Sequence, residues 1–319
     1  MQSKKIIFVI LVVVFLLSLG FSSYCAYPEK PVEVIVAWSA GGGTDVAARL
    51  VARYAEKYFG QSFAIINKAG AAGEIGFTAI AKAKPDGYTI GFINPPTTLL
   101  HPIQREGCKY TLDDFALIAN IVMDPGVIAV RAESKFDSLK TLLESAKKME
   151  KGVSVGYCGP GTADAMTLRK FENIEGIEIN KIPFDGTAPI VAALLGGHVD
   201  FAFMNISEAY TYVIEGKMRL LGVGSPKRSE MLPDVPSFRE QGYDIIQTAL
   251  RGIAAPAGFP EEYKKILEEA ISKTMSDPEF LKKVSEMQMP LQFMGSEEYT
   301  AFLKAMDEDL RREWAIAPW

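Results

Sequence analysis

Two glycine-rich loops hold the residues best suited to bind a ligand. The first, Trp38-Ser-Ala-Gly-Gly-Gly-Thr-Asp45, follows an apolar, β-branched run and precedes a segment with helical periodicity. Glycine lets the backbone approach a ligand closely, so several N–H groups can point in one direction. A helix that begins near Thr44 adds the positive end of its dipole. The first loop therefore predicts an anion-binding site.

The second loop, Gly159-Pro-Gly-Thr162, stands in the same position between a strand and a helix. We expect the Thr162 hydroxyl to cap its own helix, which leaves the backbone amides for a ligand. Ligands of open α/β sheets bind at the carboxyl ends of the strands. Two helix N-termini that face one another across a cleft would hold a carboxylate from both sides.

A nucleotide cofactor fits the first loop poorly. The dinucleotide fingerprint needs a third glycine where Val46 stands, and a ribose-binding acid where the second strand ends in Asn67-Lys68. No Gly-Lys-Ser/Thr follows the glycines, as a P-loop requires. We therefore expect no nucleotide and no other cofactor.

The cysteines and histidines do not suggest catalysis or metal binding. Cys158 lies at a strand-to-helix turn but has no histidine beside it, so a packed thiol is expected rather than a nucleophile. A two-domain protein of this size does not need a disulfide bond for stability, and we expect Cys108 and Cys158 to stay unpaired. His101 is expected in a solvated loop and His198 in a structural turn, and neither has metal-ligand spacing. The sequence indicates neither an enzyme nor a metal site.

Strand and helix patterns alternate along the chain, which predicts an α/β fold with mostly parallel sheets. The first half reads as strand 31–38, helix 45–59 ended by Gly60, strand 62–67, helix 75–83 and strand 88–94. The second half reads as helix 138–149, strand 153–158, helix 162–171, strand 177–184, helix 188–195 and strands 199–204 and 219–224. Strand 251–255 and helices 261–275 and 297–314 complete the chain.

Two α/β halves followed by a helical segment fit a protein with a cleft between two domains. We expect domain 1 to comprise residues 26–127 and 251–319, and domain 2 to comprise residues 128–250. If the C-terminal segment returns to domain 1, two or more strands cross between the domains and form a hinge.

Residues 1–25 have the layout of a secretory signal peptide. Lys4 and Lys5 precede an apolar run over 6–17 that is short for a membrane span, and small or polar residues follow. A lipid anchor on Cys25 is disfavoured because Tyr24 precedes it. Loss of the two lysines takes the net charge from −5 to −7, and an acidic chain of this kind is a poor partner for nucleic acid or an anionic membrane.

Nine short motifs, in order along the chain, resemble those of the substrate-binding receptors of tripartite tricarboxylate transporters, the Bug family. They are Tyr27-Pro-Glu-Lys-Pro31, Ala40-Gly-Gly-Gly-Thr-Asp45, Asn67-Lys-Ala-Gly-Ala-Ala-Gly73, Ala83-Lys-Pro-Asp-Gly-Tyr-Thr89, Gly159-Pro-Gly-Thr162, Pro183-Phe-Asp-Gly-Thr-Ala-Pro189, Leu195-Gly-Gly-His-Val-Asp200, Leu232-Pro-Asp-Val-Pro236 and Ala255-Pro-Ala-Gly258. The resemblance covers residues 27–314.

The resemblance implies a two-domain Venus-flytrap fold that closes on a small carboxylate and delivers it to the membrane subunits of a transporter. It implies a periplasmic or other extracytoplasmic location, and we expect a monomer. Whether the role is transport or sensing stays open. The residues that it points to are Trp38, Ala40, Gly43, Thr44, Ala71, Ala72, Pro95, Thr97, Gly159, Gly161, Thr162, Met204 and Asn205.

This chain departs from the family's pattern at two of these positions. Trp38 stands where the family more often has Phe or Tyr, which implies a smaller or differently directed pocket. Met204 stands where Asp is common, and an acid there could pair with a ligand ammonium. Its loss implies that an amino-acid ligand is disfavoured.

Export should trim the chain. Mass spectrometry of the native protein should find an N-terminus between Ser22 and Tyr27, because the small-residue region after the apolar run is where a signal peptide is cleaved. An intact Met1 in a cytoplasmic fraction would contradict the prediction.

Overall fold

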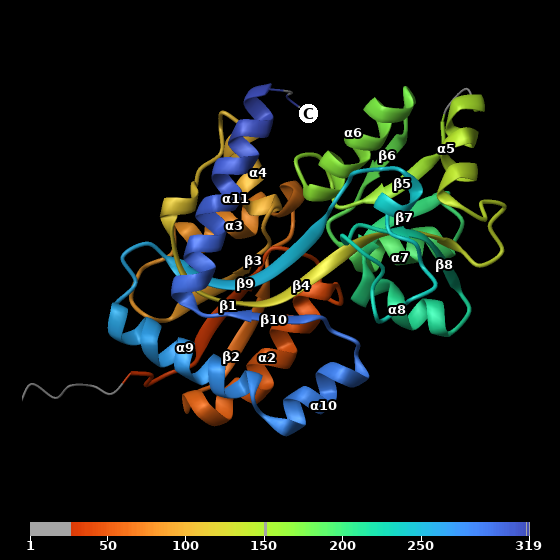
Figure 1. The fold of residues 1–319 in the computed structure, drawn as a ribbon. Coiled ribbons are helices and arrows are strands. Elements are labelled where there is room, and N and C mark those ends of the chain that lie inside the picture. The colour runs from red at the N-terminus through yellow and green to blue at the C-terminus, as the bar shows by residue number, and fades with distance from the viewer. Residues whose placement is uncertain (1–26, 150–151, 317, 319) are drawn as a thin grey trace, which may run out of the picture.

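The computed structural model describes residues 27–149, 152–316 and 318, which form two α/β lobes around one continuous, curled sheet (Figure 1). Ten strands of the described residues take part, in the order β2-β1-β3-β9-β4-β7-β5-β6, with β8 and β10 also paired to β4. The strands are β1 (Val32–Val36), β2 (Phe63–Asn67), β3 (Thr89–Ile93), β4 (Phe115–Arg131), β5 (Ser154–Tyr157), β6 (Asn180–Pro183), β7 (Phe201–Asn205), β8 (Met218–Val223), β9 (Thr248–Pro256) and β10 (Leu291–Met294).

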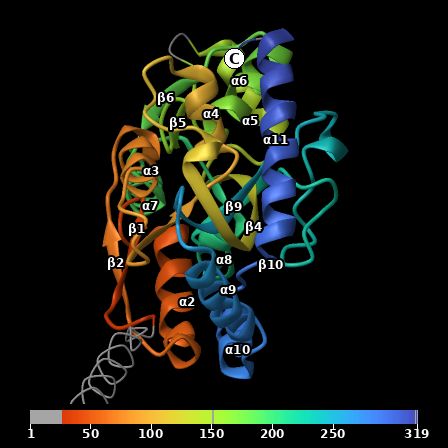
Figure 2. The same cartoon turned by 90° about the vertical axis from the view of Figure 1, so that its left-hand side faces the viewer.

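The first lobe is built on β1, β2 and β3, which are parallel, with β9 antiparallel to β3. Its helices are α2 (Gly43–Phe59), α3 (Glu74–Ala81), α4 (Thr97–Gln104), α9 (Glu261–Met275), α10 (Pro278–Glu286) and α11 (Ser296–Ile316). Helix α2 ends at Gly60, whose φ of 83° is open to glycine at little cost. Figure 2 shows α11 running upright beside β4 and β10.

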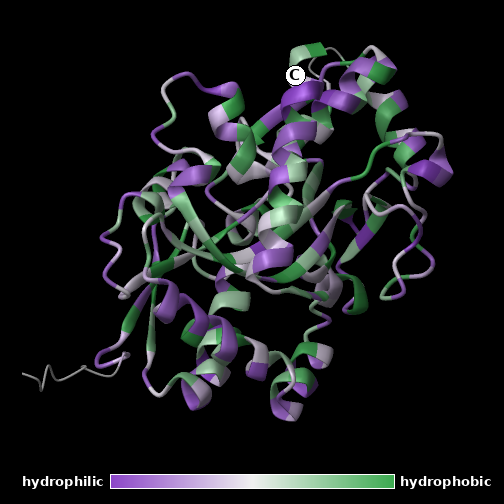
Figure 3. Ribbon diagram, turned by 60° about the vertical axis from the view of Figure 1, so that its left-hand side comes forward, coloured by the Kyte–Doolittle hydropathy of each residue, from purple (hydrophilic) through white to green (hydrophobic). Residues whose placement is uncertain are grey.

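The second lobe is built on β5, which pairs in parallel with β6 and β7. Its helices are α5 (Leu139–Lys148), α6 (Ala163–Glu175), α7 (Thr187–Leu195) and α8 (Ile206–Ile214). The end of β4 is buried on both faces, since Ile128 and Val130 join one apolar cluster while Val127 and Ala129 join another. Figure 3 shows mostly hydrophobic residues along the central strands and both hydrophobic and hydrophilic residues on the outer helices.

Strands β4 and β9 join the lobes and run side by side between them (Figure 1). Residues 115–125 of β4 pair with β9, whereas residues 126–131 pair with β7 and β8. The chain thus returns from the second lobe through β9. The domain boundaries expected at 127/128 and 250/251 fall inside β4 and β9 and remain predictions.

The α/β fold expected from the sequence is confirmed, including every strand and helix expected in both halves. No element was expected over β4, α4, α8, α10 or β10. The expectation for His101 was wrong: it lies on α4, fully buried, with Nδ1 3.0 Å from the Tyr110 hydroxyl. Burial lowers the pKa of His101 to about 3, so this side chain is neutral.

Both described cysteines, Cys108 and Cys158, are free thiols, as expected. Within the described residues, no helix is both long enough and apolar enough to cross a membrane. The signal peptide expected over 1–25, including Cys25, lies outside the described residues.

Candidate ligand-binding site

A cavity of about 50 Å³ lies between the lobes, at the carboxyl ends of β1, β3, β5 and β7. The first lobe contributes the loops after β1 and β3, and the second contributes the loops after β5, β6 and β7. Seven of the residues expected at the site line it, namely Trp38, Gly43, Thr44, Thr97, Thr162, Met204 and Asn205. Strand ends from both lobes therefore meet at one place, which is where open α/β sheets bind ligands.

The other six expected residues, Ala40, Ala71, Ala72, Pro95, Gly159 and Gly161, do not line this cavity. Some of them lie where the lobes touch nearby. The carbonyl of Ala71 accepts a hydrogen bond from Arg105, and a Cβ at Gly159 would lie 3.2 Å from Cβ of Ala72. Their role as ligand contacts remains a prediction.

Trp38 is held in the wall of the first lobe by Asn94. The indole Nε1 donates to Asn94 Oδ1 at 2.7 Å, and Asn94 Nδ2 donates to Thr44 Oγ1 at 3.0 Å and to the Leu250 carbonyl at 3.1 Å. The glycine loop itself is shaped by Asp45, which accepts from the Gly41 amide at 2.9 Å. These bonds fix the orientation of the indole ring before any ligand arrives.

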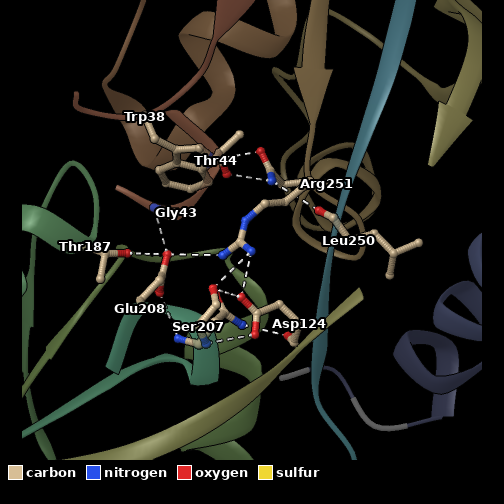
Figure 4. A network of polar contacts seen from close by, with 11 residues as sticks. Trp38, Gly43, Thr44, Asp124, Thr187, Ser207, Glu208, Leu250 and Arg251 are labelled. Carbon is tan, nitrogen blue, oxygen red and sulfur yellow. Dashed lines mark hydrogen bonds and ion pairs between the residues drawn. The ribbon is translucent and has the colours of Figure 1, made fainter. Parts of the chain in front are cut away.

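A buried arginine, Arg251 on β9, ties the two lobes together electrostatically (Figure 4). Its Nη1 lies 2.6 Å from Asp124 Oδ2 on β4, and its Nη2 lies 3.2 Å from Glu208 Oε1 on α8. The three side chains are 2%, 0% and 9% exposed, respectively. One cation is therefore shared by two carboxylates, away from water.

Glu208 also occupies the amide that was expected to bind a ligand anion. Its Oε1 accepts from the main-chain N–H of Gly43 at 3.1 Å and from the Thr187 hydroxyl at 2.9 Å. Its Oε2 accepts from the main-chain N–H of Asn205 at 2.8 Å. A carboxylate is favourably placed at the N-terminus of α2, where the helix dipole has its positive end. The anion seated there belongs to the protein itself.

The N-terminus of α6 likewise carries a protein carboxylate, Asp164, whose Oδ2 accepts from the Cys158 amide at 3.2 Å. Burial raises the pKa of Asp164 to about 7, the Cys158 amide opposes that shift, and the charge of Glu208 adds to it. Burial also raises the pKa of the Cys158 thiol well above its usual value. Cys158 is therefore protonated at neutral pH and unsuited to act as a nucleophile.

The lobes touch around the cavity through bonds that cross the cleft. The Ser39 amide donates to the Asp185 carbonyl at 3.0 Å, and the Ala163 amide donates to Thr97 Oγ1 at 3.0 Å. Arg105 of the first lobe donates to the Pro160 carbonyl of the second. Together with the bond between Gly43 and Glu208, these contacts describe a closed cleft.

Glu208, Arg251, Asp164, Thr187 and Gln247 line the cavity but were not singled out in the sequence. A carboxylate in the first turn of a helix after a glycine loop was a usable signal for Asp164. For Arg251 the signal was a lone charge at the start of an otherwise apolar strand, 251–255. No group of His, Cys, Asp and Glu within the described residues is arranged to hold a metal ion.

Two α/β lobes joined by two paired strands, with a cavity between them, define a solute-binding protein of the periplasmic type. Residues 47–317 match the family described as "Tripartite tricarboxylate transporter family receptor", and the chain belongs to this family. The family match and the binding-protein relatives identify a receptor, not an enzyme.

Individual relatives agree with that assignment. BugT of Bordetella pertussis is 30% identical over 78% of this chain and 77% of its own length. The solved structure of the periplasmic binding protein BugD has a TM-score of 0.86 at 29% identity, covering 91% of this chain and 98% of BugD. MatC from Rhodopseudomonas palustris, solved with bound malate, has a TM-score of 0.83 at 25% identity, covering 90% of this chain and 98% of MatC.

Replacing Arg251 should destabilise the fold strongly. Arg251→Met leaves Asp124 and Glu208 buried without their cation, and breaking a buried pair in this way costs about 3–5 kcal/mol. Urea-induced unfolding measures the free energy of unfolding. Arg239→Met, which removes an exposed partner of Asp244, is the matched control and should cost less than about 1 kcal/mol. Equal costs for the two variants would contradict the prediction.

Asp164→Asn should stabilise the protein more at pH 8 than at pH 5. The pKa of Asp164 is raised from 3.8 to about 7 on folding, so its contribution to stability is full below pH 3.8 and is lost as the pH rises through about 7. Asparagine stays neutral throughout and escapes that loss. Thermal melts at both pH values measure the difference, with the exposed Asp234→Asn as the control. A gain that is the same at pH 5 and pH 8 would contradict the account.

Proposed function

We propose that this chain captures a small carboxylate in the cavity between its lobes and delivers it to the membrane subunits of a tripartite tricarboxylate-type transporter. It acts outside the cytoplasmic membrane, as a monomer. The observation that carries the proposal is the cavity itself, lined by the strand ends of both lobes in a chain of this receptor family. The malate bound to MatC, a relative of similar fold, supports a short organic acid as the ligand.

Neutral groups hold the ligand in this proposal. Thr44, Thr97, Asn205 and Gly42 line the cavity, and their hydroxyl and amide groups are the proposed partners of the ligand. Glu208 already accepts from the Gly43 amide, so a ligand carboxylate reaches that amide only when Glu208 moves away. Met204 and Trp38 supply the apolar walls. Binding by amides and hydroxyls suits an anion in a cavity whose arginine is already paired.

The two halves of the cavity separate when the lobes open, so a ligand enters the open form and is enclosed on closure. Ligand favours the closed form only through its greater affinity for it. Two-domain receptors close in this way about a few residues in the connecting strands. The connecting strands β4 and β9 are placed to act as that hinge.

A screen of mono-, di- and tricarboxylic acids by thermal shift should give at least one clear hit. A ligand at one hundred times its dissociation constant stabilises the fold by about 2.7 kcal/mol through mass action. Nucleotides in the same screen serve as the negative control. If nucleotides raise the melting temperature and no organic acid does, the receptor proposal fails.

A further inference from the structure

Gln247, which immediately precedes β9, lines the cavity and has a buried side-chain amide with no hydrogen-bond partner in the described chain. The residue is 2% exposed, and neither Nε2 nor Oε1 is satisfied. Buried polar groups nearly always have hydrogen-bond partners, so a buried amide whose nitrogen and oxygen both lack one is unusual. A ligand in the cavity would supply the hydrogen-bond partners that these two atoms lack.

The main chain of Gln247 is held in place where the chain crosses between the lobes. The Gln247 N–H donates to the Gly224 carbonyl at 2.8 Å, and its carbonyl accepts from the Gly126 amide at 3.0 Å. A Cβ at Gly126 would lie 1.8 Å from Gln247 Oε1, so the glycine makes room for the side chain. These two bonds fix the main chain from which the Gln247 side chain extends.

Three other polar side chains of the cavity, those of Trp38, Thr187 and Arg251, already have protein partners. Trp38 donates to Asn94, Thr187 donates to Glu208, and Arg251 is paired with Glu208 and with Asp124 behind it. The arginine is thus outnumbered by carboxylates. A ligand carboxylate must rely on neutral donors here, and Gln247 Nε2 is one that lacks a partner.

The amide also presents an acceptor, Oε1, beside its donor. A plain carboxylic acid, with no hydroxyl or ammonium group on the carbon next to its carboxylate, can accept a hydrogen bond from Nε2. It has no donor for Oε1, which is left beside a second acceptor. A carboxylate with a hydroxyl or ammonium group on the adjacent carbon offers an acceptor and a donor side by side, which matches a primary amide through two parallel hydrogen bonds.

We propose that Gln247 binds the ligand through both amide atoms, and that the ligand is a 2-hydroxy or 2-amino carboxylic acid. Nε2 donates to a carboxylate oxygen, and Oε1 accepts from the neighbouring hydroxyl or ammonium group. This assignment rests on the proposed receptor function. The lack of an acid at Met204 does not disfavour the amino form, because Asp164 and Glu208 already place carboxylates in the cavity wall.

Isothermal titration with matched acids tests the assignment. The probes are succinate, malate and aspartate, together with propionate, lactate and alanine. Wild type should bind a substituted acid at least about tenfold more tightly than its plain counterpart, because a site built for a hydrogen bond rejects the analogue that lacks it. Gln247→Met, close to glutamine in shape, should reduce that preference to within about threefold by removing both amide bonds.

Gln241→Met is the matched control. Its Nε2 donates to the carbonyls of Leu221 and Ser237 at 3.1 and 3.3 Å, outside the cavity. This variant should melt at a lower temperature with the ligand preference intact, whereas Gln247→Met should melt no lower than wild type because it removes an unsatisfied amide. Gln247→Glu, which replaces the donor with a charge, should abolish binding of the preferred acid if the methionine variant does not fold.

The outcomes separate this inference from the receptor proposal. If wild type binds the plain and substituted acids equally, or if Gln247→Met keeps the preference, the assignment of Gln247 is wrong while the receptor proposal stands. If no organic acid binds wild type at all, both are wrong.

Discussion

The buried cation of Arg251 is the constraint on which the rest of the site depends. A guanidinium out of water needs close counter-charges, and it finds one on β4, Asp124, and one on α8, Glu208. Because β4 and β9 connect the lobes and α8 belongs to the second lobe, satisfying one side chain brings three elements to the same point. The same Glu208 then reaches the N-terminus of α2, so the ion pair and the first glycine loop form one continuous network.

The N-termini of helices α2 and α6 both lie beside carboxylates of the protein itself. These carboxylates are Glu208 at α2 and Asp164 at α6. The positive end of a helix dipole is thereby balanced inside the protein. Neutral donors and acceptors around the cavity then bind the ligand. Among them is the side-chain amide of Gln247, whose two polar atoms have no hydrogen-bond partner in the protein.

The sequence predicted the alternating elements well, because hydrophobic period, glycine stops and loop composition are local properties. The resemblance to the receptor family pointed to Trp38, Thr44 and Thr97, and all three line the cavity. The sequence did not predict the partners of Arg251, which lie 127 and 43 residues away. Nor did it predict that His101 is buried, because the helix around it contains Pro102 and reads as a loop. Pairing across the fold is set by tertiary packing, which a local pattern does not contain.

Closure of the two lobes around a small organic acid is tested most directly by small-angle X-ray scattering. The contacts across the cleft, such as that between Ala163 and Thr97, can form only when the lobes are together. The radius of gyration should therefore fall when the best acid from the screen is added to saturation, and the profile should then match the closed structure. A radius of gyration that is the same with and without saturating ligand would show a rigid cleft and contradict the account.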